Sequence, residues 1–411
     1  MDVQSGDRVR IEKDNNIYEG ILMPTSTDQI VIKLDNGYNI GFRGEEIQIS
    51  LVEEKKSKQV KAKEIPFKEG LPKISILSTG GTIASKVDYR TGSVTSQFTS
   101  EDIIQAIPEL SEFANYDAEV IYSILSENMR TEYWVELARK AAEKIEDGAK
   151  GIIITHGTDT MAYTASALSF MVETPVPIVF VGSQRSADRP SSDNAMNATC
   201  GAIVATGDIA EVTVVMHGST SDDFCYIHRG TRVRKMHTSA RDAFKSIGIN
   251  PIGKVDYGNR GVLISGEYRR RGERGLELRD RLEGRCALIK FYPGADPEVI
   301  DFYVDREYRG IVIEGTGLGH VSTDWFNSIE SAIKDGVAIV TTSQCIYGRV
   351  CDRVYDTGRD LLRAGVIEGE DMLSETALVK LMCVLGNIDD PGEVRRVMQT
   401  NLAGEITTRT K

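Results

Sequence analysis

Three stretches of the chain share one pattern, in which a short and mainly apolar run of residues ends in a cluster of glycine, threonine and serine. The apolar runs are residues 74–77, 151–154 and 178–181, and the clusters that follow them are residues 78–82, 155–160 and 182–184. A strand without polar alternation is covered on both faces, which predicts an α/β fold with a mostly parallel sheet. Ligands of such folds bind at the carboxyl ends of the strands, so the clusters predict a binding crevice.

This alternation of strands and helices occurs twice along the chain. A highly charged stretch at residues 267–274 separates the first set of apolar strands from a second set, at residues 287–290, 310–314 and 337–341. We therefore predict two α/β domains, a catalytic one at residues 72–265 and a C-terminal one at residues 284–411. Residues 266–283 would link them.

The first 52 residues have a different pattern of apolar and polar residues. Apolar and polar residues alternate with period two at residues 8–12, 18–22 and 29–34, which is typical of half-buried antiparallel strands. Asp35, Asn36 and Gly37 tolerate positive φ and predict a hairpin turn. We expect a small SH3-like β-barrel at residues 1–52, followed by a charged, solvated linker at residues 53–71.

The composition excludes several classes of protein. With 41% hydrophobic and 27% charged residues, the chain is neither collagen-like nor disordered. Its 49 Lys plus Arg against 61 Asp plus Glu give a net charge of −12, so the main grip on a nucleic acid would have to come from another molecule. Six cysteines without a CxxC pair, and the absence of HExxH, argue against a metal site. The chain has no signal segment or membrane-length apolar run, which predicts a cytoplasmic protein.

Two threonines beside glycines, Thr82 and Thr158, are the candidates for chemistry. Either could serve merely as a helix N-cap, but each follows an apolar strand within a glycine-containing cluster. A threonine hydroxyl is a weak nucleophile until a base takes its proton. His156 could supply that base or could only pack at its strand end. A desolvated lysine oriented by Asp159 is the other possibility, and the residue pattern does not select which lysine.

A glycine-rich segment at residues 315–319 follows another apolar strand. It lacks the full GxGxxG spacing because His320 occupies the last position. The segment therefore favours a tight strand-to-helix turn over a nucleotide-binding loop.

The two threonine clusters carry a family resemblance. STGGTIA at residues 78–84 and THGTDT at residues 155–160 resemble the two signature motifs of the L-asparaginase/glutaminase family, in the family's order and spacing, and residues 72–411 match throughout. The resemblance implies a two-domain asparaginase-like fold. The segment at residues 182–193 and the extra N-terminal barrel resemble the branch of that family found in archaeal glutamyl-tRNA(Gln) amidotransferases.

The resemblance also implies roles for individual residues. Thr82 would be the primary nucleophile, and Thr158, Asp159 and Lys235 would form a Thr-Lys-Asp triad. Tyr89 would assist the first threonine. The substrate would be held by the residues Ser126, Asp159, Gly81 and Ser183, the last through its backbone N–H in the oxyanion hole. Where bacterial members place an intersubunit asparagine, this chain has Gly319 and His320.

The implied activity is hydrolysis of the side-chain amide of L-glutamine, with release of ammonia. A homodimer would assemble with a partner, the E-type amidotransferase subunit, into a heterotetramer in which the partner binds tRNA, ATP and Mg²⁺ and converts Glu-tRNA(Gln) to Gln-tRNA(Gln). This chain would need no cofactor of its own. The alternatives are a stand-alone L-asparaginase and a non-catalytic small-ligand binding module.

The N-terminal barrel has its own prediction. Residues 1–70 contain 11 Lys plus Arg and 13 Asp plus Glu, a net charge of −2. This charge favours contact with a protein over extensive binding to the phosphate backbone of a nucleic acid. We expect this region to dock the partner or tRNA. The alternative is a domain that only covers apolar surface of the catalytic domain.

Overall fold

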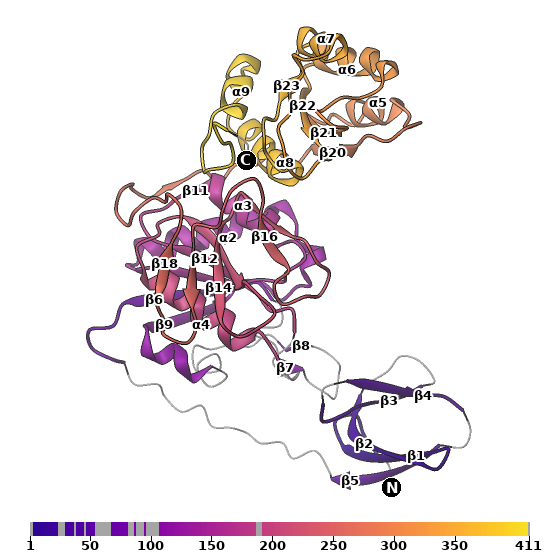
Figure 1. Ribbon diagram of the computed structural model, residues 1–411, viewed down its shortest axis with the longest axis vertical. Coiled ribbons are helices and arrows are strands. Elements are labelled where there is room, and N and C mark those ends of the chain that lie inside the picture. The colour runs from indigo at the N-terminus through magenta and orange to yellow at the C-terminus, as the bar shows by residue number, and fades with distance from the viewer. Residues whose placement is uncertain are drawn as a thin grey trace.

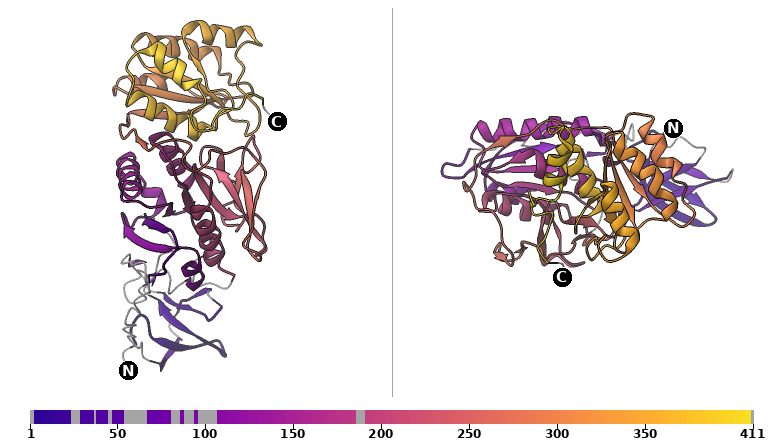
Figure 2. Two further views of the ribbon diagram at one scale, coloured as in Figure 1. Left: turned by 90° about the vertical axis from the view of Figure 1, so that its left-hand side faces the viewer. Right: turned by 90° about the horizontal axis from the view of Figure 1, so that it is seen from above.

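The computed structural model describes residues 3–23, 29–36, 38–44, 47–53, 67–80, 86–87, 94–95, 107–185 and 191–409. Three parts follow one another in chain order (Figures 1 and 2): a small β-domain, a large α/β domain and a second α/β domain that carries the C-terminus. Gly37, Gly81, Thr82 and Tyr89, all named in the sequence predictions, lie outside the described residues.

The small N-terminal domain is a five-stranded antiparallel sheet in the order β4-β3-β2-β1-β5. Alternating side chains of these strands point to one side, where Val9, Ile11, Ile32 and Phe42 form the core. The predicted hairpin is confirmed, since Lys33 pairs with Asn39 across the turn. The strands are β1 (Arg8–Lys13), β2 (Asn16–Met23), β3 (Ile30–Lys33), β4 (Asn39–Phe42) and β5 (Gln48–Glu53).

The large domain is built on an eight-stranded sheet in the order β18-β17-β14-β13-β12-β10-β6-β9. The five strands from β9 to β13 in this order are parallel, and the three beyond them are antiparallel. The mostly parallel sheet predicted from the sequence is therefore confirmed. The strands are β6 (Lys73–Ser78), β9 (Asn115–Val120), β10 (Ile152–Thr155), β12 (Ile178–Val181), β13 (Val212–His217), β14 (Phe224–Arg229), β17 (Gly253–Asp256) and β18 (Val262–Ile264).

Helices cover both faces of this sheet, which explains the unbroken apolar strands. Ile152 and Ile154 of β10 join the core under α2 (Thr131–Glu146) and α3 (Met161–Met171), whereas Ile153 joins the core under α4 (Asn194–Thr206). Short pairs of strands complete the domain: β7 (Lys86–Val87) with β8 (Val94–Thr95), β11 (Val172–Glu173) with β19 (Glu277–Leu278), and β15 (Val233–Lys235) with β16 (Phe244–Ser246). Two 3₁₀ helices span Pro108–Glu112 and Ser126–Asn128.

The C-terminal domain has a four-stranded parallel sheet, β20 (Cys286–Lys290), β21 (Gly310–Gly315), β22 (Ala338–Ser343) and β23 (Ile367–Glu368). Its helices are α5 (Glu298–Val304), α6 (Phe326–Lys334), α7 (Asp356–Ala364), α8 (Ser374–Leu385) and α9 (Pro391–Met398), with a 3₁₀ helix at Thr323–Trp325. Helix α9 begins at Pro391, and the preceding Asp390 caps it by accepting a bond from the backbone of Glu393.

The two α/β domains share one apolar core. Leu168 of α3 and Leu381 of α8 belong to the same buried cluster, and the hydroxyls of Ser166 and Thr376 lie 3.3 Å apart between the two helices. Residues 266–283, the predicted linker, contribute β19 to the β11–β19 pair. The hydroxyl of Thr376, in the first turn of α8, also donates to the backbone carbonyl of Thr231 at 3.1 Å, close to the start of β15.

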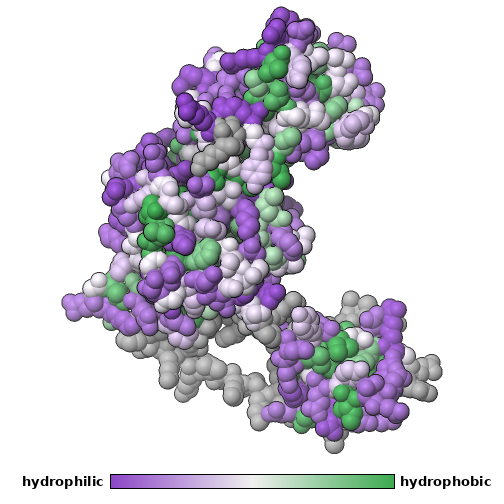
Figure 3. All heavy atoms as spheres, in the orientation of Figure 1, coloured by the Kyte–Doolittle hydropathy of each residue, from purple (hydrophilic) through white to green (hydrophobic). Residues whose placement is uncertain are grey.

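The face drawn in Figure 3 is mainly hydrophilic, with small apolar patches. One of them lies over β18, where Val262, Leu263 and Ile264 are exposed. None of the described helices is both long and apolar enough to span a membrane.

Candidate active site

The described parts of the glycine- and threonine-rich clusters lie at the carboxyl ends of the parallel strands β6, β10 and β12. Thr79, directly after β6, is buried and donates its hydroxyl to the carbonyl of Thr155 at the end of β10, with Oγ1 and O 3.0 Å apart. This side chain fixes two neighbouring strand ends to each other. Its hydroxyl is thereby occupied in this structural contact.

Thr158, Asp159 and Lys235 come together, as the family resemblance implies. The Nζ of Lys235 lies 3.0 Å from Oγ1 of Thr158 and 2.6 Å from Oδ1 of Asp159. The lysine side chain is 14% exposed and that of Asp159 is 65% exposed, so the amine is largely removed from water while the carboxylate faces outward. A proton can pass between hydroxyl and amine at this separation.

Lys235 is presented by a short hairpin. It ends β15 and pairs with Phe244 of β16, whose ring is fully buried. The rigid pairing places the lysine opposite the loop between β10 and α3, which carries Thr158. Residues 77 positions apart thereby meet across the strand-end crevice.

Ser126 lies against the same loop. A Cβ atom added at Gly157 would lie 2.6 Å from the Cβ of Ser126, so only glycine allows this approach. Thr160 donates its hydroxyl to the carbonyl of Ser126 at 2.7 Å. The structure therefore places Ser126 directly beside the loop that carries Thr158.

Ser183 follows β12 and is buried. Its hydroxyl donates to Oδ1 of Asp193 at 2.8 Å. A Cβ added at the preceding Gly182 would lie 2.9 Å from Cγ2 of Thr158, so this segment packs directly on the threonine loop. Five predicted site residues lie in the described part of the chain and come together at the carboxyl ends of the parallel strands: Ser126, Thr158, Asp159, Ser183 and Lys235.

His156 is not arranged as the base for Thr158. Its Nδ1 lies 2.7 Å from the carbonyl oxygen of Gly157, which can only accept, so Nδ1 carries the proton. Burial lowers the pKa of this imidazole to about 4, and the ring lies 5.9 Å from that of Phe180. The strand-end packing role, one of the two interpretations of His156, fits this geometry.

The glycine-rich segment at residues 315–319 forms a tight turn. The backbone N–H of Thr316 donates to the carbonyl of His320 at 2.8 Å, and Gly317 and Gly319 have φ angles of 52° and 105°. This closed turn is the tight strand-to-helix turn that the sequence predicts. The ring of His320 packs edge-on to that of Tyr355 at 5.5 Å.

The three parts of the chain match three known families. Residues 73–265 match the family described as Asparaginase, N-terminal, and residues 285–398 match the Glutaminase/Asparaginase C-terminal domain. Residues 3–52 match the GatD N-terminal domain. The D-type subunit of glutamyl-tRNA(Gln) amidotransferase from Methanosarcina barkeri is 59% identical over 99% of both chains, and that from Archaeoglobus fulgidus is 57% identical over 99% of this chain and 96% of its own.

The chain belongs to the GatD family of glutamyl-tRNA(Gln) amidotransferase subunits. Among solved structures, the thermostable L-asparaginase from Thermococcus kodakarensis is 34% identical, with a TM-score of 0.74, and covers 82% of this chain and 100% of its own. L-asparaginase I from Vibrio cholerae is 30% identical, with a TM-score of 0.72, and covers 82% of this chain and 99% of its own. The predicted family and the asparaginase-like fold are confirmed.

The structure of this GatD family member shows neighbours of the site that the sequence motifs do not indicate. Glu375, near the start of α8, is buried, and its Oε1 lies 3.4 Å from Nε of Arg234, the residue before Lys235. Burial raises the pKa of this carboxyl group. A single glutamate in an apolar helix is the signal that could have drawn attention to it.

No described histidines, cysteines and carboxylates gather into a group of three or more that could hold a metal ion. The six cysteines are all free thiols.

Proposed function

We propose that this chain hydrolyses the side-chain amide of L-glutamine and supplies the released ammonia to a partner subunit. The observation that carries the proposal is the contact of the Lys235 amine with both Thr158 and Asp159. A largely desolvated amine beside a hydroxyl is an arrangement that activates oxygen nucleophiles or relays their protons. The family membership adds support, because its members carry the name of an amidotransferase subunit.

The proposed reaction has two steps. A threonine oxygen attacks the amide carbon of glutamine and forms a tetrahedral intermediate, while the Lys235 amine passes the hydroxyl proton to the leaving nitrogen. The C–N bond then breaks, ammonia departs, and the acyl group remains as an ester on the threonine. Water then attacks the ester and releases glutamate. Following the motif resemblance, we assign the attack to Thr82, with Tyr89 assisting and Thr158, Lys235 and Asp159 relaying protons.

The substrate would be held by residues around the threonine loop. Asp159 is exposed enough to meet the α-amine while it also contacts Lys235, and Ser126 and Gly81 would hold the α-carboxylate end. The backbone N–H of Ser183 would stabilise the developing oxyanion, since the segment at residues 182–183 packs on Thr158.

The ammonia would be used by a partner that binds tRNA, ATP and Mg²⁺ and converts Glu-tRNA(Gln) to Gln-tRNA(Gln) in the cytoplasm. The net charge of −12 supports this division, because an acidic chain is a poor binder of a phosphate backbone. We propose that two copies of this chain assemble with two copies of the partner.

The test measures ammonia release from glutamine and from asparagine by the chain alone and in complex with its partner, ATP and glutamylated tRNA. The proposal expects glutamine to be the better substrate and the partner with charged tRNA to raise its rate. Steady asparagine hydrolysis without any partner would identify a stand-alone asparaginase instead. Binding of glutamine without hydrolysis under all these conditions would identify a binding module.

A further inference from the structure

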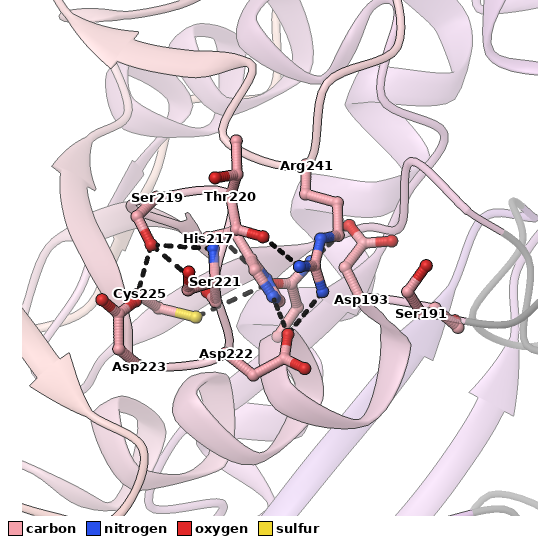
Figure 4. A network of polar contacts seen from close by, with 12 residues as sticks. Ser191, Asp193, His217, Ser219, Thr220, Ser221, Asp222, Asp223, Cys225 and Arg241 are labelled. Carbon is pink, nitrogen blue, oxygen red and sulfur yellow. Dashed lines mark hydrogen bonds and ion pairs between the residues drawn. The ribbon is translucent and has the colours of Figure 1, made fainter.

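A series of polar contacts connects side chains that include Asp193, His217, Asp222 and Arg241 (Figure 4). It begins at Asp193, which is fully buried at the start of α4. One carboxylate oxygen accepts bonds from the Ser183 hydroxyl at 2.8 Å and the Arg185 backbone at 2.9 Å. The other accepts from the Gln184 backbone at 2.9 Å and from the Asn197 amide at 3.0 Å. Four donors and the helix N-terminus stabilise the buried charge.

Asp193 thereby fixes the segment at residues 183–185 that follows β12. The neighbouring Gly182 is held by the same group, because the amide of Asn197 also donates to its carbonyl at 2.9 Å. Since Gly182 packs on the methyl group of Thr158, a shift of this segment would move the surface on which the threonine loop rests.

Asn197 carries the connection to His217. With its nitrogen donating to Gly182 and Asp193, its Oδ1 must be the acceptor, and it accepts from the backbone N–H of His217 at 3.0 Å. The same Oδ1 lies 2.6 Å from Nδ1 of the His217 ring, which must therefore carry a proton.

The other ring nitrogen of His217 also faces an acceptor. Nε2 lies 3.1 Å from Oδ1 of Asp222, so it too needs a proton for a hydrogen bond. A neutral imidazole has a single N–H, and only the imidazolium form satisfies both neighbours. Deprotonation therefore breaks one of the two contacts.

This series of polar contacts ends beside the hairpin that carries Lys235. The guanidinium of Arg241 donates to Asp222 and to the carbonyl of Thr220. Arg241 lies in the loop between β15, which ends at Lys235, and β16. Two segments that border the site, at residues 182–185 and 236–243, are thus joined through five side chains: Asp193, Asn197, His217, Asp222 and Arg241.

We propose that Asp193 and His217 are positioning residues for amide hydrolysis, which hold the segment at residues 182–185 in register with the Lys235 hairpin, and that the connection is complete only while His217 is protonated. This inference rests on the proposed function. It names no new group that touches the substrate.

The titration of His217 determines how the connection depends on pH. Burial lowers the pKa of the ring, and the neighbouring Asp222 and Asp193 oppose that effect. The charged and titratable groups that face this part of the chain are Asp193 before α4, Asp222 and Asp223 from the loop after β13, Arg241 from the loop after β15, and the buried thiol of Cys225 on β14. As pH rises through the pKa of His217, the connection is lost.

The experiment compares kcat and KM for glutamine, as functions of pH, in the full complex and in four variants. Asp193→Asn preserves the volume of the side chain. In either orientation of the amide, however, its NH2 group would replace an oxygen that now accepts two hydrogen bonds. We expect at least a tenfold lower kcat with KM changed less. Asp222→Asn and His217→Gln test the central contacts of the series. Asp223→Asn is the matched control, because the carboxylate of Asp223 binds Ser219 and the backbone of Phe224 instead.

We expect the wild-type profile to contain a component that falls as pH rises through a value below 6.5. The component should move to lower pH in Asp222→Asn, disappear in His217→Gln and stay in Asp223→Asn. Superimposable profiles of wild type, His217→Gln and Asp222→Asn, or an Asp193→Asn kcat within twofold of wild type, would overturn the inference. If Asp193→Asn does not fold, the pH profile of Asp222→Asn provides the test, because the Asp222 side chain is half-exposed and its substitution should leave the fold intact. A wild-type complex that never hydrolyses glutamine would instead refute the proposed function.

Discussion

Arg232 and Asp371 form an ion pair between the two α/β domains, with Nη2 of the arginine and Oδ2 of the aspartate 2.8 Å apart and each side chain only 1% exposed. Arg232 also donates to the backbone carbonyl of Asp371, and Thr407 donates to the carboxylate. The arginine immediately precedes β15, three residues before Lys235. The contact therefore joins the C-terminal domain to the strand that presents the lysine.

Removing one partner of this pair should be costly. Arg232→Ala removes the fully buried cation and leaves the Asp371 carboxylate with the more distant guanidinium of Arg349, 3.6 Å away. We expect a loss of about 3 to 5 kcal/mol in the free energy of unfolding. Denaturant unfolding measures it. The control is Arg363→Ala, which removes an exposed helical pair with Asp360 and should cost less than about 1 kcal/mol. Equal losses in the two variants would contradict the assigned role of burial.

The lysine itself is tested by charge-preserving substitution. Lys235→Arg keeps a cation but cannot give up its proton at working pH, so we expect it to be nearly as damaging as Lys235→Ala, at least about a hundredfold in kcat. Lys245→Arg, on the paired strand β16 and bound to Asp242, should stay within twofold of wild type. Near-normal turnover of Lys235→Arg would mean that the lysine supplies only charge.

The two threonines should behave as members of one unit. We expect Thr158→Ala and Thr82→Ala each to reduce glutaminase turnover at least about a thousandfold while the chain stays folded. Thr158→Ser retains a hydroxyl beside Lys235 and should keep much more activity. External ammonium should still support amidation by the partner with both alanine variants, because only ammonia supply is lost. Wild-type turnover by either alanine variant is the result that excludes this mechanism.

The buried His156 should lower the free energy of unfolding of the chain in acid. Its pKa is about 4 when folded against an ordinary value of 6.5, so the unfolded chain binds more protons between these values, and stability rises with pH across that window. His156→Gln should remove this contribution, roughly 2 to 3 kcal/mol of the stability lost between pH 7 and pH 4.5. Unfolding measured at both pH values gives the difference. An unchanged pH dependence would show that His156 does not titrate in this way.

The N-terminal domain is tested by deleting residues 1–70. If it docks the partner or tRNA, the remaining chain should hydrolyse glutamine at its intrinsic rate, while tRNA-dependent amidation by the complex weakens. Loss of hydrolysis from a folded catalytic domain would refute the docking role. Unchanged rates of both reactions would favour a domain that only covers apolar surface.

The sequence predicts the local features of this protein well, because they depend on short-range pattern. The unbroken apolar strand at residues 152–154 indicates a sheet covered on both faces, and the glycines at 317 and 319 indicate a tight turn. Lys235 is identified only through family resemblance, since it meets Thr158 from 77 residues away. The buried partners of Arg232 and His217 lie on other elements, and no local pattern encodes such contacts.

The central claim is that the threonine site of this chain supplies the nitrogen used by the partner. Supplying the complex with glutamine labelled with ¹⁵N in its side-chain amide, together with unlabelled ammonium, ATP and glutamylated tRNA, measures this directly. The account predicts ¹⁵N in the glutaminyl-tRNA made by the wild-type complex and only unlabelled nitrogen in that made with Thr158→Ala. Equal ¹⁵N incorporation by both complexes, or none by wild type, would contradict it.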